Sequence, residues 1–366
     1  MRILVAMDSF KGSMTSLEAG NAVREGILRV FSSADVIVRP MADGGEGTVE
    51  ALSCSCEGEM VTLNVTGPLG DPVDASYYVT DDKTAIMESA SACGITLVDS
   101  ARLDPLKATT FGSGELIRDA ISRGCRRFII GLGGTATNDG GIGMLAALGF
   151  RFLDRIGDPV SGGASGLEQL AVIDTDNAMS ELKECEFIAA TDVDNPMCGL
   201  NGASHVFAPQ KGASAEDVVR MDEWMARYAS LTASVILSAD PDIPGSGAAG
   251  GLGFAIMAYL GGRCSSGARL IIKETGLEDL IAGSDLVITG EGHIDRQTDM
   301  GKAVSVVRDI AGIYGREVIA IGGIVDSGCD AYQIKRYHED CMMNANAREN
   351  LALTVSEIMK DRHKSI

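Results

Sequence analysis

The sequence has few of the features that mark secreted, membrane or zinc-binding proteins. No apolar run reaches about 18 residues, the length that a membrane-spanning helix needs. The apolar run in the opening MRILVAMDSFKG is too short for a signal peptide. The nine cysteines include no C-x-x-C pair, and the four histidines are isolated in the sequence. We therefore expect a cytoplasmic protein with reduced thiols, without a disulfide framework or a zinc site.

Positive charge is also scarce. The chain has 31 Lys and Arg residues against 51 Asp and Glu residues, which gives a formal net charge of -20 at pH 7. Such a surface repels nucleic acid and anionic membranes, so we expect neither as a partner. A small anionic substrate is still compatible with this charge, because a few lysines can reverse the field locally.

Two common catalytic signatures are absent as well. The sequence contains neither the P-loop G-x-x-x-x-G-K-[ST] nor the nucleophile elbow G-x-S-x-G. What it has instead is 45 glycines, many of them beside short apolar runs. Glycines at the junctions of strands and helices are typical of α/β proteins whose backbone approaches a ligand closely.

The order of apolar segments in this chain of 366 residues predicts two α/β domains. RILVAM, a helical segment with the capping box Thr15–Glu18, and DVIVRP begin a β-α-β pattern, and SDLVITGEG and REVIAIGG near the end resemble it. We predict a discontinuous parallel-sheet domain from residues 1–66 and 283–366. Residues 67–282 would form an inserted mixed α/β domain, with the active site in the cleft between the two.

Candidate site residues follow the predicted strands, because ligands of open α/β sheets bind beyond the carboxyl ends of the strands. Lysines there suit phosphate or carboxylate, acids suit Mg²⁺ or a substrate hydroxyl, and glycine-rich turns offer amides to an anion. Each candidate also has a structural explanation, as a surface lysine, a helix cap or a turn. The candidates are Asp8, Ser9 and Lys11, then Asp43 and Glu46, the stretch Gly131–Gly141, Asp192 and Asn195, Lys211, and finally Glu291, Asp295 and Lys302.

The stretch GLGGTATNDGG, residues 131–141, supports two interpretations. Gly131, Gly133 and Ala136 fit the G-x-G-x-x-A turn of dinucleotide-binding proteins, and Asp154 lies about 20 residues on, where a ribose-binding acid belongs. The protein would then be an NAD(P)-dependent oxidoreductase acting on a small hydroxy acid. Against this, Asp139 adds a negative charge near a pyrophosphate, and no hydride-transfer partner is evident. The alternative is phosphoryl transfer, which mainly needs cations, positioning and an Asp that orients a hydroxyl.

Several motifs occur together in the order seen in one family. They are DSFKGS, ADGGEGT, TGPLG, SGEL, GLGGTATNDGG, DVDNP, FAPQKGA, GAAGG and TGEGHIDRQT…GK, and with them the sequence resembles the bacterial glycerate kinases over nearly its whole length. The resemblance implies phosphorylation of D-glycerate by ATP and Mg²⁺, to 2- or 3-phosphoglycerate and ADP. It also implies two α/β domains, of which the one formed by both chain ends is Rossmann-like. A non-catalytic sugar-acid binding protein is less well supported, because paired acids and cations exceed what binding needs.

We assign roles from the chemistry of phosphoryl transfer. Asp192 would orient or deprotonate the attacking hydroxyl, and Lys11 and Lys302 would neutralise phosphate or the glycerate carboxylate. Candidates for Mg²⁺ through water are Asp43, Glu46 and Asp295. The remaining predicted ligands of substrate or phosphate are Asp8, Ser9, Gly133, Gly134, Thr135, Thr137, Asn138, Asp139, Gly140, Gly141, Asn195, Lys211 and Glu291. The predicted partners are D-glycerate and ATP, with a homodimer as the candidate assembly.

Overall fold

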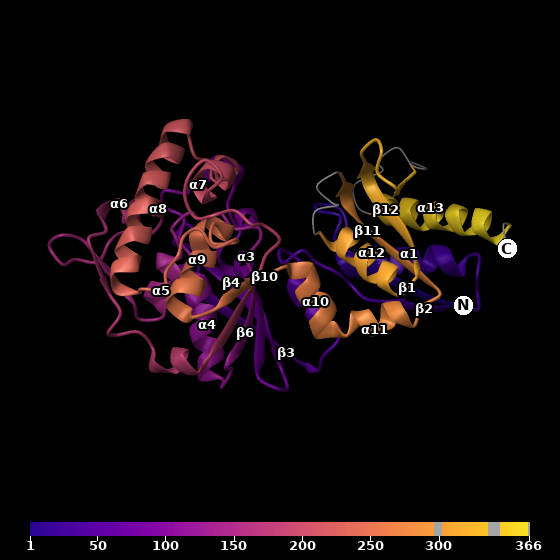
Figure 1. Ribbon diagram of the computed structural model, residues 1–366, viewed down its shortest axis with the longest axis horizontal. Coiled ribbons are helices and arrows are strands. Elements are labelled where there is room, and N and C mark those ends of the chain that lie inside the picture. Colours follow the sequence, from indigo (N-terminus) through magenta and orange to yellow (C-terminus); the bar gives the residue numbers. More distant parts are fainter. Residues whose placement is uncertain (296–301, 336–344, 365–366) are drawn as a thin grey trace. The chain divides into compact units, whose positions relative to one another are not determined.

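A computed structural model describes residues 1–295, 302–335 and 345–364 (Figure 1). Contacts within the chain divide it into two compact units. Unit 1 contains Met1–Asp43, Glu50–Cys56 and Ser266–Ile366, and unit 2 contains Gly44–Val49 and Glu57–Ser265. Both units are α/β, which confirms the predicted fold class. The domain limits drawn from the sequence, 1–66 with 283–366 around 67–282, remain a prediction.

Unit 1 is built on a parallel sheet with the strand order β13-β12-β11-β1-β2. Its strands are β1 (Arg2–Met7), β2 (Asp35–Val38), β11 (Leu286–Ile294), β12 (Glu317–Val325) and β13 (Tyr332–Gln333). Its helices are α1 (Ser16–Leu28), α10 (Gly267–Thr275), α11 (Leu277–Ala282), α12 (Ala303–Ile313) and α13 (Ala345–His363), together with most of α2 (Thr48–Ser53).

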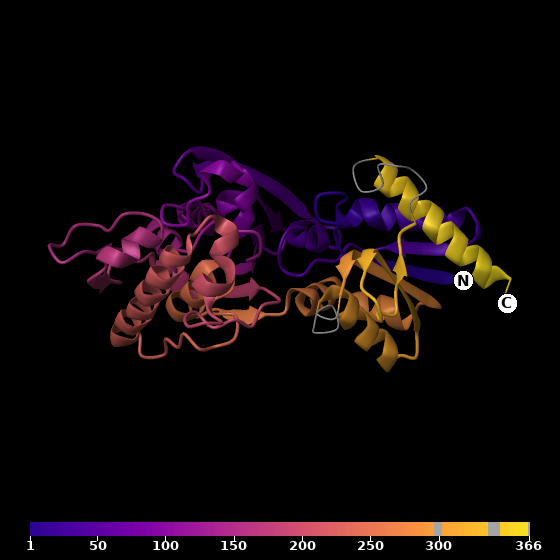
Figure 2. The same ribbon diagram turned by 90° about the horizontal axis from the view of Figure 1, so that it is seen from above.

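Two sides of this sheet are covered by helices. Right-handed crossovers from β1 to β2 and from β11 to β12 run in opposite directions across the sheet, so α1 and α12 lie on opposite faces. Helix α13 packs against α1 on its face, as Figure 2 shows. The predicted capping box of α1 is confirmed, because the Thr15 side chain accepts from Glu18 N while the Glu18 carboxylate accepts from Thr15 N.

Unit 2 contains a mixed sheet with the strand order β10-β9-β6-β5-β4-β3. Strands β10, β9, β6 and β5 are parallel to one another. Strand β4 pairs antiparallel with both β5 and β3. The strands are β3 (Gly58–Thr66), β4 (Pro72–Thr80), β5 (Thr84–Glu88), β6 (Arg127–Gly131), β9 (Glu186–Ala190) and β10 (Arg263–Ser265). Strands β7 (Arg151–Leu153) and β8 (Val172–Asp174) form a separate antiparallel pair.

The helices of unit 2 enclose one large apolar core with the sheet. They are α3 (Ser89–Cys93), α4 (Phe111–Ser122), α5 (Ile142–Ala147), α6 (Ala164–Gln169), α7 (Ala203–Phe207), α8 (Ala215–Val235) and α9 (Ala248–Leu260). The start of α9 is irregular, because Gly250 has φ +68° and a Cβ there would lie 2.2 Å from the carbonyl oxygen of Thr137. The glycines of the motif GAAGG, residues 247–251, therefore serve close packing. Within the described residues, no helix combines the length and the apolar character that crossing a membrane requires.

Candidate active site

The carboxyl ends of the parallel strands of unit 2 lie level with one another. Glu88 at the end of β5 pairs with Gly131 at the end of β6, and Gly131 pairs with Ala190 at the end of β9. Ala190 in turn pairs with Ser265 at the end of β10. The segments after these residues therefore start from one edge of the sheet, which is where an open α/β sheet binds its ligands.

The glycine-rich turn Gly44–Val49 packs on this edge. Gly44 has φ +89°, and a Cβ there would lie 2.7 Å from the carbonyl of Ala190, so the position requires glycine. Gly44 O accepts a hydrogen bond from Gly133 N at 3.3 Å. The turn therefore brings Glu46, which is exposed, to the same unit as the stretch after β6.

Most of the stretch of residues 131–141 is buried, and Gly133 and Gly134 are the exceptions. Gly133 is half-buried and Gly134, with φ +78°, is exposed, whereas the residues from Thr135 onward are buried. Within this stretch, the segment at Gly133 and Gly134 is therefore the one that a small anion can reach.

Gly140 and Gly141 are held by the protein itself. Gly140 N donates to Gly250 O at 2.9 Å, and Gly141 N donates to Asp139 Oδ1 at 3.0 Å. A Cβ on Gly140 would lie 2.8 Å from the ring of Tyr228. We predicted amides at these two glycines that point at an anion, but the structure commits both amides to internal acceptors.

Asp139 has the surroundings of a structural carboxylate. It accepts hydrogen bonds from Thr110 N at 2.9 Å, from the Thr110 hydroxyl, from Gly141 N at 3.0 Å and from Gly143 N at 3.3 Å. Burial raises the pKa of Asp139, and these hydrogen bonds counteract part of that rise. Asp139 thus joins the start of α4 to the start of α5, and its carboxylate is turned into the protein.

Two further predicted ligands are also turned inward. Thr137 and Asn138 are both 0% exposed. Asn138 Nδ2 donates to Ser204 Oγ at 3.0 Å, which links the turn to α7. The side chains of Asn138 and Asp139 therefore form internal hydrogen bonds, although polar residues between glycines suggest an exposed binding loop.

Lys211 binds the stretch of residues 131–141 from inside the protein. Its side chain is 3% exposed, and its Nζ donates to Thr137 O at 2.6 Å and to Thr135 Oγ1 at 3.3 Å. Burial lowers the pKa of Lys211 to about 8, and the negative charge of Asp139 opposes that shift. We predicted a phosphate ligand at this position, and the structure gives the ammonium group to the turn instead.

The buried ammonium group leads to a prediction about pH. Lys211 titrates near 8 when folded against an ordinary value of 10.5, so between these values the unfolded state binds more protons and stability rises with pH. Between pH 8 and pH 10.5, the free energy of unfolding of the wild type should therefore rise by about 3 kcal/mol relative to that of Lys211→Met. Denaturant titrations at several pH values measure this. Cys93 and Asp139 are present in both proteins. If the difference between their free energies of unfolding does not change with pH, the pKa of Lys211 is not lowered.

Asp192 follows β9 at the edge where the strands end. It is half-buried, whereas Asp194 two residues on is exposed. Asn195 Nδ2 donates to Asn201 O at 2.8 Å, so this side chain shapes the loop that follows Asp192. Of the two acids, Asp192 is the better candidate for a catalytic role, because partial burial favours strong electrostatic interaction with a substrate.

In unit 1, a second group of predicted residues gathers at the ends of β1 and β11 and after β2. Asp8 is 6% exposed, and burial raises its pKa well above the ordinary value, with the charges of Asp43 and Glu291 adding to the rise. A hydrogen bond from Ser9 N and the charge of Lys11 act in the opposite direction. Lys11 is largely exposed and lies 3.7 Å from Asp43.

Asp295 and Lys302 lie on either side of residues 296–301, which belong to the motif TGEGHIDRQT…GK and fall outside the described residues. Asp295 comes directly after β11, and Lys302 is the N-cap residue of α12. Between the ends of β11 and β12, His293 Nε2 lies 2.9 Å from Asp326 Oδ1, and this hydrogen bond raises the pKa of His293.

The acids of unit 1 fit Mg²⁺ held through few direct ligands. The described residues contain no group of three or more His, Cys, Asp or Glu side chains arranged to hold a metal ion. Mg²⁺ needs no such cage, because it usually binds one or two carboxylates together with water and phosphate oxygens. Asp43, beside the buried Asp8, supplies a carboxylate where a cation would relieve negative charge. Glu46 groups with unit 2, so the three predicted metal residues are divided between the units.

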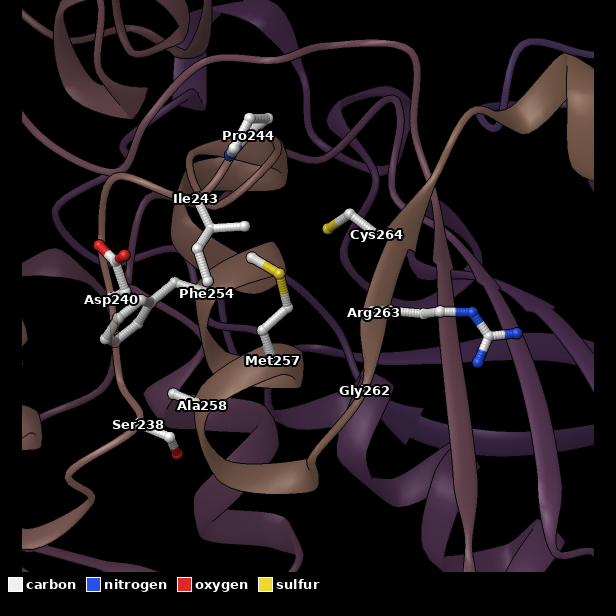
Figure 3. Close-up of a pocket in the computed structure, with 10 residues that line it drawn as sticks. All are labelled: Ser238, Asp240, Ile243, Pro244, Phe254, Met257, Ala258, Gly262, Arg263 and Cys264. Atoms are coloured by element: carbon white, nitrogen blue, oxygen red, sulfur yellow. The ribbon is translucent and has the colours of Figure 1, made fainter.

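Unit 2 also contains a cavity of about 340 Å³ between α9, β10 and the segment before α9 (Figure 3). Ile243 and Met257 point into it, Cys264 lies on the opposite wall, and Arg263 points away. Its lining is Ser238, Asp240, Ile243, Pro244, Phe254, Met257, Ala258, Gly262, Arg263 and Cys264. None of the residues predicted to bind substrate lines this cavity.

One polar residue at the edge of the unit 2 sheet, Glu88, is not among the residues predicted from the sequence. Glu88 ends β5 at the level where β6 and β9 end. Its segment TAIME is an apolar strand that ends in an acid. The rule that selected Asp192, applied to this strand as well, would have found it.

The comparisons with known proteins agree on one family. The model of the glycerate kinase family matches residues 3–364. The chain belongs to the glycerate kinase family. The Glycerate 2-kinase of Escherichia coli K12 is 43% identical over 324 residues, covering 88% of this chain and 85% of that protein. The Glycerate kinase of Halalkalibacterium halodurans is 42% identical over 330 residues, covering 90% and 87%.

A solved structure supports the same assignment. The crystal structure of a protein provisionally named glycerate kinase 2, from Salmonella typhimurium LT2, superposes with a TM-score of 0.86 at 42% identity and covers 100% of both chains. The resemblance seen in the motifs is therefore confirmed, and the chain is a kinase that phosphorylates glycerate.

The rival oxidoreductase finds no support in these comparisons, and the fold explains why its motif is misleading. In dinucleotide-binding folds, the strand that carries the ribose-binding acid lies parallel in the same sheet. Strand β7 before Asp154 instead pairs antiparallel with β8 in a separate sheet. Asp154 Oδ1 accepts from Ile156 N and Asp158 N, both at 2.9 Å, so this acid closes a turn.

Proposed function

We propose that the protein transfers the γ-phosphoryl group of ATP, with Mg²⁺, to the 2-hydroxyl of D-glycerate, which gives 2-phosphoglycerate and ADP. Family membership carries the kinase reaction. The choice of the 2-hydroxyl is supported by the relative from Escherichia coli, which is named a Glycerate 2-kinase.

Asp192 acts on the attacking hydroxyl in this proposal. It follows a buried strand at the edge where β6 and β9 end, and it is half-buried. A carboxylate in such a position accepts the proton of the hydroxyl as the oxygen attacks phosphorus, or orients the hydroxyl in line. The exposed backbone at Gly134 binds an anionic group of the substrates.

Lysines and acids predicted from the sequence contribute charge. Lys11 and Lys302 neutralise phosphate oxygens or the glycerate carboxylate, because an ammonium group is a compact point charge. Asp43, with Asp295 and Glu46 as further candidates, would hold Mg²⁺ through water. The ion, when bound, supplies neutralisation of charge on the phosphate oxygens.

Phosphorus NMR of the product tests this proposal most directly. The protein is incubated with D-glycerate, ATP and Mg²⁺, and the proton-coupled ³¹P signal distinguishes a phosphate on a secondary carbon from one on a primary carbon. We expect 2-phosphoglycerate with equimolar ADP, and loss of product with excess EDTA. A product phosphorylated at the primary hydroxyl would overturn the regiochemistry, and turnover that persists in EDTA would overturn the role of Mg²⁺.

Two accompanying proposals concern the environment and the assembly of the protein. We propose a cytoplasmic location and a homodimer. Light scattering during size-exclusion chromatography measures the molar mass, and a mass of one chain, 38.2 kDa, would contradict the dimer.

A further inference from the structure

Glu88 binds the glycine-rich turn Gly44–Val49 through its side chain. Oε1 of Glu88 accepts from Gly47 N at 3.0 Å and from Val49 N at 2.9 Å. Both amides belong to the turn, and Gly47 has φ +93°. Hydrogen bonds to a carboxylate are among the stronger ones in proteins, so these two fix the second half of the turn to the end of β5.

The first half of the turn is fixed to the neighbouring strands by backbone contacts. Gly44 packs on the carbonyl of Ala190 at the end of β9, and its own carbonyl accepts from Gly133 N beyond β6. Thr48 Oγ1 donates to Gly45 O at 2.7 Å and closes the turn internally. One turn therefore spans the ends of β5, β6 and β9.

The turn differs from the chain on either side of it. Asp43 and Glu50, which flank it, group with unit 1, whereas the turn groups with unit 2. Its place in unit 2 therefore depends on the bonds that it makes there. The two bonds to Glu88 depend on a side chain, so a substitution can remove them.

We propose that Glu88 is a positioning residue for phosphoryl transfer. It holds the turn Gly44–Val49 against the ends of β6 and β9, beside Gly133, the exposed Gly134 and the start of the loop that carries Asp192. This inference rests on the proposed placement of the reacting groups at that edge. Glu88 itself touches neither substrate, and it acts through the turn.

Positioning has a recognisable kinetic consequence. A displacement of about 1 Å in groups that hold reacting atoms can cost about 10²-fold in rate, even when binding is little changed. Removal of the two hydrogen bonds should therefore lower kcat more than it changes KM. A residue that only stabilises the fold would lower the melting temperature and leave kcat of the folded protein unchanged.

Three substitutions at residue 88 test the proposal. Glu88→Ala removes the acceptor, Glu88→Asp withdraws it by one methylene, and Glu88→Gln keeps an oxygen that can accept from both amides. We expect kcat to fall about 10- to 100-fold in the Ala and Asp variants, and to remain within a few-fold of wild type in the Gln variant. KM for ATP and D-glycerate should change less than kcat in all three.

Glu186→Gln is the matched control. Glu186 starts β9 and forms ion pairs with Arg127 and Arg263 at the opposite end of the same sheet. This control should keep wild-type kcat. Glu88→Ala or Glu88→Asp with wild-type kcat would overturn the positioning role, as would a Glu88→Gln variant as slow as Glu88→Ala. A wild-type protein that forms no phosphoglycerate would instead overturn the proposed function.

Discussion

Asp192→Asn should lower kcat for phosphorylation of D-glycerate by about 10²- to 10⁴-fold, the range by which general base catalysis accelerates such a step. The amide has the shape of the carboxylate, but it cannot take the proton of the attacking hydroxyl. Because Asp192 lies in the loop after β9 and its substitution leaves the apolar strand intact, the variant should keep the wild-type melting temperature. A coupled assay of ADP release at saturating substrates measures kcat.

Asp194→Asn provides the control for this experiment. Asp194 belongs to the same loop but is exposed, so loss of its charge should change kcat less than about two-fold by the rule that exposed charges interact weakly. Near-normal turnover of Asp192→Asn would remove Asp192 from the role of base. Equal losses in both variants would indicate an effect of net charge in this loop.

The parts of the fold that the sequence predicts are those set by local pattern. The capping box Thr15–Glu18, the apolar strands and the placement of polar residues after those strands depend on neighbours in sequence, and the structure reproduces them. The mixed sheet also follows, because three closely spaced strands leave no room for crossover helices.

The sequence predicts less well where burial reverses the usual preference of a residue. Lysine, asparagine and aspartate are mostly exposed, and the sequence predicts Lys211, Asn138 and Asp139 as ligands because they lie in loops or glycine-rich turns. In the structure Lys211 donates to Thr137 O, Asn138 donates to Ser204, and Asp139 accepts from Gly141 N. Nothing local in TNDGG reveals that Tyr228 and Gly250, far along the chain, cover the turn.

The same limit explains why Glu88 was missed and why the turn Gly44–Val49 could not be placed. From the sequence, a glycine-rich turn that follows β2 is expected to belong to the same unit as β2. Its actual partners, Glu88, Gly133 and Ala190, come from distant segments, and each contact involves the backbone of the turn. Backbone contacts leave almost no trace in the sequence except the glycines that they require. The glycines therefore mark where the site is, but not what they touch.

Loss of the buried carboxylate of Asp139, which organises the stretch of residues 131–141, should have a large effect on stability. Asp139→Ala should lower the free energy of unfolding by about 3–5 kcal/mol, because the amides of Thr110, Gly141 and Gly143 lose their acceptor and the nearby Lys211 keeps a buried charge. Asp139→Asn keeps the volume and one acceptor oxygen, so its loss should be smaller, about 1–3 kcal/mol. Denaturant titration at pH 7 gives both values.

Asp154→Ala is the matched control for the buried carboxylate. Asp154 also accepts two backbone amides in unit 2, but its turn is partly open to solvent, so water replaces the lost acceptor and the cost should stay near 1 kcal/mol or below. If Asp139→Ala costs no more than Asp154→Ala, the hydrogen bonds of Asp139 do not organise the turn. If Asp139→Asn raises KM for D-glycerate and leaves stability unchanged, the carboxylate instead contacts the substrate, as the sequence alone suggested.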